Sequence, residues 1–149
     1  MSKFSQGEFI PKNPQKLVGK SVPVYRSSWE LKLMLYLDEH KDVLTWGSEE
    51  LSIPYRSPID GRIHRYFPDF MVKIKNREGL VESMILEVKP AAQTQPPKSP
   101  KRRTKRYISE VMTYGVNEAK WKAAREYCKD KGWEFRIITE AELFKKPTK

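Results

Sequence analysis

The sequence is poor in the residues from which disulfides and zinc sites are built. Its 149 residues include one cysteine, Cys128, and two histidines, His40 and His64. A single cysteine excludes an internal disulfide, and these three residues provide no zinc-ligand framework at the usual spacing. No apolar run approaches the ~20 residues of a membrane span. The first residues also lack the apolar core of a secretory signal, so we expect an intracellular protein without a membrane partner.

Acidic residues are also in the minority. The chain has 29 lysine and arginine residues against 19 acidic ones, a formal net charge of +10. Lysine and arginine supply the sequence-independent part of nucleic-acid affinity, although net charge can also serve solubility alone. Six basic residues and no acid occupy residues 98–106, and we expect them to contact nucleic acid: Lys98, Lys101, Arg102, Arg103, Lys105 and Arg106. A nuclear-localisation signal is the competing interpretation of this cluster.

The length suits one domain. Residues 1–24 have little periodicity and carry three prolines among lysines, which predicts an extended basic N-terminal arm. Residues 25–149 are predicted to form a single α/β domain, of mixed α+β composition. Its expected order is a helix, a three-strand antiparallel meander, a second helical region, a strand and a short helix.

Local signals place the first elements of this domain. Ser27 or Ser28 before an apolar stripe predicts a helix over 29–40. The strands of the meander are expected over 49–55, 62–75 and 80–89, joined by short turns. Pro68 within the second strand favours an edge position or a bulge.

The second half is predicted to be helical over 107–114, to break at Gly115 and to resume with Asn117 as the N-cap. Gly132 is expected to end this helix. Helical spacing assigns four residues to the core: Ala119, Trp121, Ala124 and Cys128. It assigns four basic residues to an outer stripe: Lys120, Lys122, Arg125 and Lys129. A strand over 133–138, parallel to a central strand, and a short helix over 140–144 complete the prediction.

The candidate site lies where two predicted strands meet. Asp69 begins an apolar run in the second strand, and Glu87 and Lys89 close the third. Side chains alternate along a strand, so Glu87 and Lys89 point to one face and Leu86 and Val88 to the other. If the strands are neighbours, Asp69, Glu87 and Lys89 converge at one end of a sheet. Two carboxylates suit Mg²⁺, and a lysine beside the activated water suits phosphodiester hydrolysis.

A third carboxylate could join them. Glu30 lies within the apolar stripe of the first helix, between Leu33, Met34 and Leu37. A carboxylate there is costly to bury without a partner, so Glu30 is a candidate metal-site residue. The alternative is that it serves the helix dipole in the first turn.

Residues 90–100 contain four prolines and no apolar periodicity, and they lead into the basic cluster. Long loops of this kind are usually functional or disordered. We predict a flexible loop over 90–106 that closes on a nucleic-acid backbone. Three basic residues nearer the candidate site are also expected to touch phosphate: Arg26, His64 and Arg65.

Pro68-Asp69, followed by Glu87-Val88-Lys89 with an acid on an upstream helix, resembles the PD-(D/E)xK, or restriction-endonuclease-like, superfamily. The layout is most similar to its TnsA-type endonucleases. This resemblance implies a DNA endonuclease in which Asp69, Glu87 and the Val88 carbonyl bind Mg²⁺, with Mn²⁺ as a substitute. It further implies that Glu30 completes or tunes the site, that Lys89 positions the attacking water, and that the products carry 5′-phosphate and 3′-hydroxyl ends.

The length and the basic arm also resemble the head-completion nucleases of T4-like tailed phages. That resemblance implies action on double-stranded DNA during virion assembly in the host cytoplasm, with the portal or other head proteins as further partners. Two alternatives remain open at this point. One is a DNA-binding or portal-docking structural protein of the same fold, and the other is a transposon-end or junction-resolving nuclease.

Overall fold

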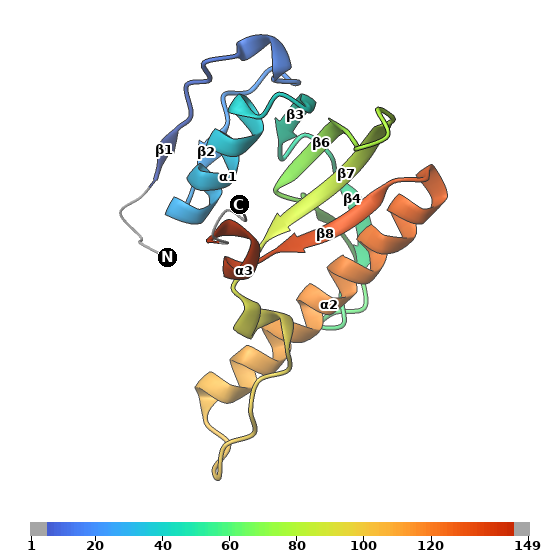
Figure 1. The fold of residues 1–149 in the computed structure, drawn as a ribbon. Helices are drawn as coiled ribbons and strands as arrows, with labels where there is room; N and C mark the ends of the chain where they lie inside the picture. Colours follow the sequence, from blue (N-terminus) through green and yellow to red (C-terminus); the bar gives the residue numbers. More distant parts are fainter. Residues whose placement is uncertain (1–5, 145–149) are drawn as a thin grey trace.

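The computed structural model describes residues 6–144, and a four-stranded sheet lies at its centre. The strand order is β3 (Val43–Ser48), β6 (Phe70–Lys75), β7 (Val81–Val88) and β8 (Glu134–Ile138). β3, β6 and β7 pair antiparallel, whereas β8 pairs parallel to β7, as predicted for the strand that follows the long helix. Helix α1 (Ser28–Glu39) packs over one face and α2 (Lys105–Lys131) over the other (Figure 1).

Alternation along β7 divides the core between the two faces. Leu86 and Val88 belong to the apolar cluster beneath α1, whereas Ile85 belongs to the cluster beneath α2. Glu87 follows Ile85 by two residues and therefore points to the α2 face. The predicted alternation of this strand is confirmed, and it determines which elements surround Glu87.

Helix α1 forms as predicted, because Ser27 provides the N-cap and its hydroxyl accepts the Glu30 N–H at 3.1 Å. The described part of the N-terminal arm packs against this helix and β3. It contains β1 (Gly7–Glu8), a 3-10 turn over Pro14–Lys16 and β2 (Val24–Tyr25). Phe9 is buried against Trp46 at a centroid distance of 5.6 Å, and the buried Asp38 carboxylate accepts backbone N–H groups of the arm.

The predicted meander is wrong in its strands. β3 was missed, and the predicted strand 62–75 is two strands, β5 (Ile63–Tyr66) and β6, which belong to different sheets. β5 pairs with β4 (Ile53–Arg56) in a separate hairpin on the α2 side. Pro68 lies in the break between β5 and β6, and not in an edge strand or a bulge. It has no N–H for a ladder, and this explains why the strand ends there.

Helix α2 runs without a break through Gly115, so the predicted interruption is wrong. Its N-cap is Thr104, whose hydroxyl accepts the Tyr107 N–H, and Asn117 is a buried helical residue. One glycine costs a helix only about 1 kcal/mol, which burial of the predicted core residues on this helix outweighs. Gly132 ends the helix with φ of 71°, as predicted. Thr139 caps α3 (Glu140–Leu143), also as predicted.

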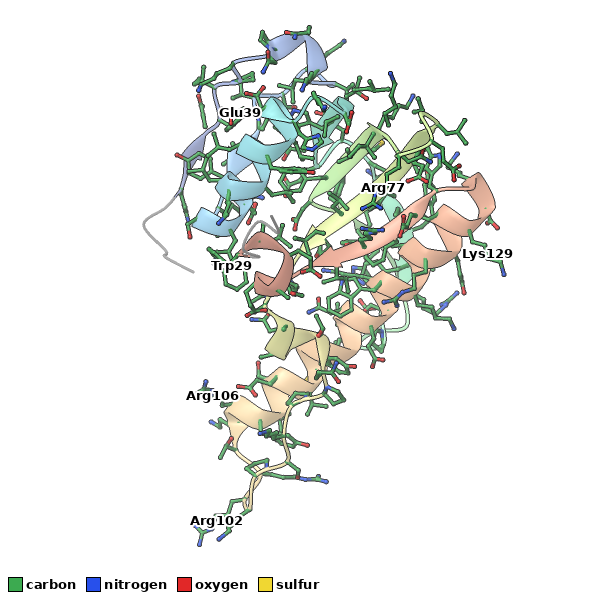
Figure 2. The ribbon with its side chains drawn as sticks, viewed as in Figure 1. Trp29, Glu39, Arg77, Arg102, Arg106 and Lys129 are labelled. Atoms are coloured by element: carbon green, nitrogen blue, oxygen red, sulfur yellow. The ribbon has the colours of Figure 1, made fainter. Side chains whose placement is uncertain are left out.

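The N-terminal half of α2 projects from the rest of the molecule (Figure 1). It is preceded by a 3-10 turn over Ala91–Thr94 and an irregular segment over 95–104. Arg102 and Arg106 lie near the tip of this projection (Figure 2). None of the helices in the described range is both long enough and apolar enough to span a bilayer.

Candidate active site

The structure places Asp69 and Glu87 side by side at one end of the central sheet. Phe70 pairs with Leu86, so Asp69 and Glu87 continue this antiparallel register just beyond β6. The Val88 N–H donates to Asp69 Oδ2 at 2.8 Å, and the Asp69 N–H donates to Glu87 Oε1 at 3.3 Å. Each carboxylate is thus fixed through one oxygen by the backbone of the other strand, and one oxygen of each remains for a ligand.

Both carboxylates are desolvated. Glu87 is 7% exposed, and its burial raises its pKa, although the Tyr66 hydroxyl and the nearby lysine charges oppose this. Burial, followed by the neighbouring Glu87 charge, raises the pKa of Asp69 well above its ordinary value. Within residues 6–144 neither carboxylate makes an ion pair at salt-bridge distance. Two crowded acidic groups without a paired cation fit a divalent metal ion, which prefers such oxygen ligands.

Lys89 follows directly from β7. Its backbone N–H donates to the Ile138 carbonyl at 3.0 Å, which ties this end of the chain to β8. The Lys89 charge lowers the pKa of Asp69 and of Glu87, against the effect of burial on both. The lysine is therefore close enough to act electrostatically on the pair without pairing directly with either member.

Glu30 approaches this pair from the first turn of α1 but does not join it. Its charge raises the pKa of Asp69, while its own pKa is raised by burial. The Ser27 hydroxyl lies 3.4 Å from Glu30 Oε2, so the carboxylate turns toward the helix cap. Across residues 6–144, no three Asp, Glu, His or Cys side chains come together in one metal-binding group. The direct cluster is the Asp69 and Glu87 pair.

Comparison with known proteins identifies the family of the chain that carries this site. The family model described as TnsA-like endonuclease N terminal matches residues 40–140, a segment that holds Asp69, Glu87 and Lys89 and starts after Glu30. The chain belongs to the TnsA-like endonuclease family. It is also 37% identical over 139 residues to the head completion nuclease of Enterobacteria phage T4, an alignment that covers 90% of each chain.

Membership of this family makes the chain a nuclease, a hydrolase that acts on DNA. The resemblance stated from the Pro-Asp and Glu-x-Lys motifs is thereby confirmed. The mixed α/β fold class is confirmed as well, since the observed sheet and helices are those of a restriction-endonuclease-like domain.

The basic residues expected to bind nucleic acid fall into two groups in this TnsA-like nuclease. Outside the projection, Arg26 makes a two-point ion pair with Glu49, at 2.6 and 3.3 Å, and its pKa is raised by Glu49 and to a smaller extent by Glu30 and Asp69. His64 on β5 lies 2.8 Å from Asp60. Arg65 is exposed on β5. The second group is exposed on the projection, in the segment before α2 and in its first turn: Lys98, Lys101, Arg102, Arg103, Lys105 and Arg106.

Two further residues of the site escaped the sequence reasoning. Lys120 was assigned to the outer face of α2, and this is wrong. It is half-buried, with Nζ 5.8 Å from the Tyr55 ring centroid and 5.7 Å from the Tyr66 ring centroid, and its charge lowers the pKa of Glu87. Its position three residues after the buried Asn117 and four before the buried Ala124 is the signal that could have placed it there.

Tyr66 is the second. The structure buries this residue at 3% exposure. Its hydroxyl lies close enough to the Glu87 carboxyl to lower the pKa of that group, but among residues 6–144 it makes no hydrogen bond of good geometry. Burial and the neighbouring Glu87 charge raise the pKa of this phenol, which therefore stays protonated. It forms the wall of the site between Glu87 and Lys120.

Proposed function

We propose that the chain is a Mg²⁺-dependent DNA endonuclease, with Mn²⁺ as a substitute metal. The observation that carries this proposal is the pair formed by Asp69 and Glu87. Glu87 is buried and Asp69 is half-buried beside it. Each carboxylate is held by the backbone of the other strand, and neither has an ion-pair partner within the described residues. They would hold the metal ion with the Val88 carbonyl as a further ligand, and Glu30 would tune the site from the end of α1.

A bound Mg²⁺ supplies charge neutralisation and a lowered pKa for water at the scissile phosphate. Lys89 orients the attacking water and offsets the charge that grows on the phosphate oxygens. The attacking water would give up one proton to the solvent as its oxygen bonds to phosphorus, the bond from phosphorus to the 3′ oxygen would break, and that oxygen would take up a proton from the solvent. The products would be a 5′-phosphate and a 3′-hydroxyl. Tyr66 and the core beneath α2 keep bulk water from the inner side of Glu87.

Double-stranded DNA is the proposed substrate. The exposed lysines and arginines on the projection supply a sequence-independent attraction for its phosphates, which weakens with salt. Arg26, held beside the site by Glu49, and Arg65 on β5 would position the backbone nearer the reacting phosphate.

The T4 relative suggests the biological setting. Its name describes head completion, and it aligns with almost the whole chain. We therefore propose that this nuclease acts during phage virion assembly inside the host cell, on packaged DNA, with the portal or other head proteins as partners.

The test is cleavage of supercoiled and linear plasmid at low salt with Mg²⁺, Mn²⁺ or EDTA. Asp69→Asn keeps an oxygen for the Val88 N–H but removes the charge, and Lys89→Met removes the ammonium group. We expect each to lower the cleavage rate by about 10²–10⁴-fold, the range for a group that acts on the reacting proton or charge. Metal removal should abolish cleavage.

Lys75→Met, an exposed lysine on β6, is the matched control and should cleave at the wild-type rate. Equal cleavage by Asp69→Asn and wild type would overturn the proposed site. A folded wild type that binds DNA and never cleaves it, with either metal, would favour a structural DNA-binding role for the fold.

A further inference from the structure

Helix α2 carries a polar ridge that runs along its projecting half and ends at the buried Asn117, where the helix joins the core. Ser109, Thr113 and Asn117 recur at four-residue spacing, which places them on one side of the helix. All three line two separate hollows, one on each flank of the ridge. The ridge therefore lies between two hollows that share its three polar side chains, and we call the ridge and these two hollows together the channel.

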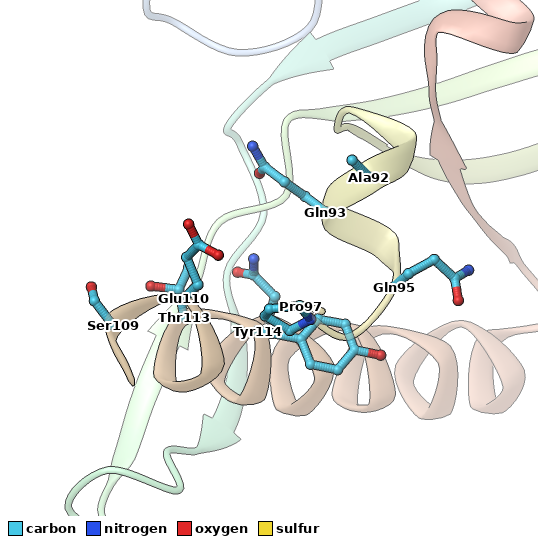
Figure 3. A pocket seen from close by; sticks show the side chains of 9 residues that line it. Ala92, Gln93, Gln95, Pro97, Ser109, Glu110, Thr113 and Tyr114 are labelled. Carbon is cyan, nitrogen blue, oxygen red and sulfur yellow. The ribbon is translucent and has the colours of Figure 1, made fainter. Parts of the chain in front are cut away.

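The two walls of the channel come from different parts of the chain. On one flank, Gln93, Gln95 and Pro97 enclose a cavity of about 380 Å³ against the helix (Figure 3). On the other, Ile59 from the β4–β5 turn faces Ile108 and Met112 across a more open hollow of about 520 Å³. The second flank is largely apolar, although Ile59, Ile108 and Met112 are each about half exposed.

Lysines stand at both ends of the apolar flank. Lys105 marks the projecting end, and Lys120 marks the end beside Tyr66 and Glu87. No carboxylate lines this hollow, and the one acid in the channel, Glu110, lies on the opposite flank and pairs with Arg106 at 3.0 Å. The sixteen residues from Lys105 to Lys120 span about 22 Å of helix.

We propose that this channel binds a single-stranded DNA segment that continues from the strand being cut. An unpaired strand exposes base faces as well as phosphates, whereas a duplex hides its base faces in the stack. Apolar side chains on one flank, hydroxyl and amide groups along the ridge and lysines at both ends match that combination. At about 3.4 Å per nucleotide the length suits up to about six nucleotides, and hollows of a few hundred Å³ do not admit a duplex.

The inferred role of the channel rests on the proposed nuclease function. DNA binding by the channel can be tested separately, because it is measured without metal. Met112→Glu places a negative charge on the apolar flank of the channel. Val111→Glu adds the same charge at the preceding residue, which is about equally exposed and lines neither hollow. Both variants change the surface, so both are expected to fold.

The measurement is fluorescence anisotropy in EDTA with two labelled probes, an oligothymidylate and a blunt hairpin duplex. We expect Met112→Glu to weaken oligothymidylate binding by about 5- to 150-fold, which is the worth of one base contact expressed as a ratio of dissociation constants. For Val111→Glu, the factor by which oligothymidylate binding weakens should exceed the factor by which hairpin binding weakens by less than twofold. Hairpin binding by the two variants should be equal, because phosphates of a duplex would contact the basic tip in both.

Equal losses in both variants, or unchanged oligothymidylate binding by Met112→Glu, would overturn the channel and leave the apolar flank as a protein-docking surface. These outcomes do not affect the carboxylate site. Conversely, channel binding in a protein that fails to cleave any DNA would retain the inference and refute the nuclease. With cleavage established, a duplex bearing an unpaired branch should be cut faster than the blunt duplex by the wild type and not by Met112→Glu.

Discussion

The two halves of α2 use the same helix for different purposes. The C-terminal half, residues 117–131, buries Trp121, Ala124 and Cys128 against the hairpin and the sheet, and Asn117 at its start is also buried. The N-terminal half, residues 105–116, buries no residue to that degree and leaves Ile108, Val111 and Met112 exposed. Only the C-terminal half is required for the core.

This contrast shows which part of the helix the fold maintains for its own stability. An isolated helix of about twelve residues is marginal in water, so the projecting half persists because it continues a helix anchored elsewhere. Apolar residues that contribute little to the core, placed between a basic tip and a carboxylate pair, are better explained by a ligand than by folding.

The largest expected effect is on stability. Trp121→Ala in the anchored half should lower the free energy of unfolding by about 3–5 kcal/mol, because it removes a buried ring and leaves a cavity. Ile108→Ala in the projecting half should lower it by less than about 0.5 kcal/mol. Urea unfolding followed by far-ultraviolet circular dichroism measures both without relying on tryptophan fluorescence.

A cost for Ile108→Ala that approaches the cost for Trp121→Ala would mean that the projecting half belongs to the cooperative core. The channel would then be a consequence of packing. A Trp121→Ala protein that does not fold at all agrees with the prediction, provided that Ile108→Ala remains near wild type.

A smaller effect concerns the carboxylates beside the junction of the two halves. In the metal-free protein the pKa of Asp69 is raised by burial and by Glu87, so the folded state binds more protons than the unfolded state at pH values above the ordinary Asp range. The free energy of unfolding must then fall as pH rises through that window. Asp69→Asn removes the buried charge and should raise the midpoint of thermal unfolding by a few degrees at pH 8 in EDTA.

The advantage of Asp69→Asn should shrink as pH falls from 8 to 5, because wild-type Asp69 becomes protonated, and it should shrink again at pH 8 when Mg²⁺ is added. Glu118→Gln, an exposed acid on α2, is the control and should show no comparable gain. If the midpoint of thermal unfolding of Asp69→Asn at pH 8 in EDTA is lower than that of the wild type, a favourable partner stabilises the charged Asp69 carboxylate. The repulsion from Glu87 would then not be the dominant effect.

The sequence predicted what depends on short-range patterns. Local chemistry predicted three features that the structure contains: the alternation around Glu87, the Ser27 cap of α1 and the Gly132 end of α2. The parallel pairing of β8 was predicted from its place after a long helix, and the structure agrees. The mistakes arose where tertiary packing decides. Gly115 stays helical because α2 is anchored beyond it.

β3 escaped the sequence analysis for a similar reason. Its Thr45-Trp46-Gly47 lacks clear alternation, and it pairs with β6 only because the hairpin from 53 to 66 folds out of the sheet. Lys120 was placed in solvent because charge patterning ignores a neighbouring hairpin, and the rings of Tyr55 and Tyr66 supply its surroundings. The carboxylate pair was within reach of the sequence, but the residues around it were not.

The smallest effect tests whether the two halves of α2 act as one rigid rod. Gly115 lies next to the junction, and a Cβ built there would be 3.9 Å from Pro58 Cγ, an ordinary contact. Gly115→Ala should therefore raise the free energy of unfolding by about 0.5–1 kcal/mol. Gly132→Ala should lower it by about 1–2 kcal/mol, since φ of 71° strains any residue with a Cβ although nothing crowds the site.

The cleavage rate and the oligothymidylate affinity of Gly115→Ala show whether α2 must bend at Gly115. If both remain at the wild-type level, the projecting half works as a fixed extension of the anchored half, and the channel needs no bending at the junction. A variant that is more stable but cleaves branched DNA more slowly would show that the helix must flex at Gly115 to bring the strand to Glu87. The glycine would then be retained for that motion, at a cost in stability.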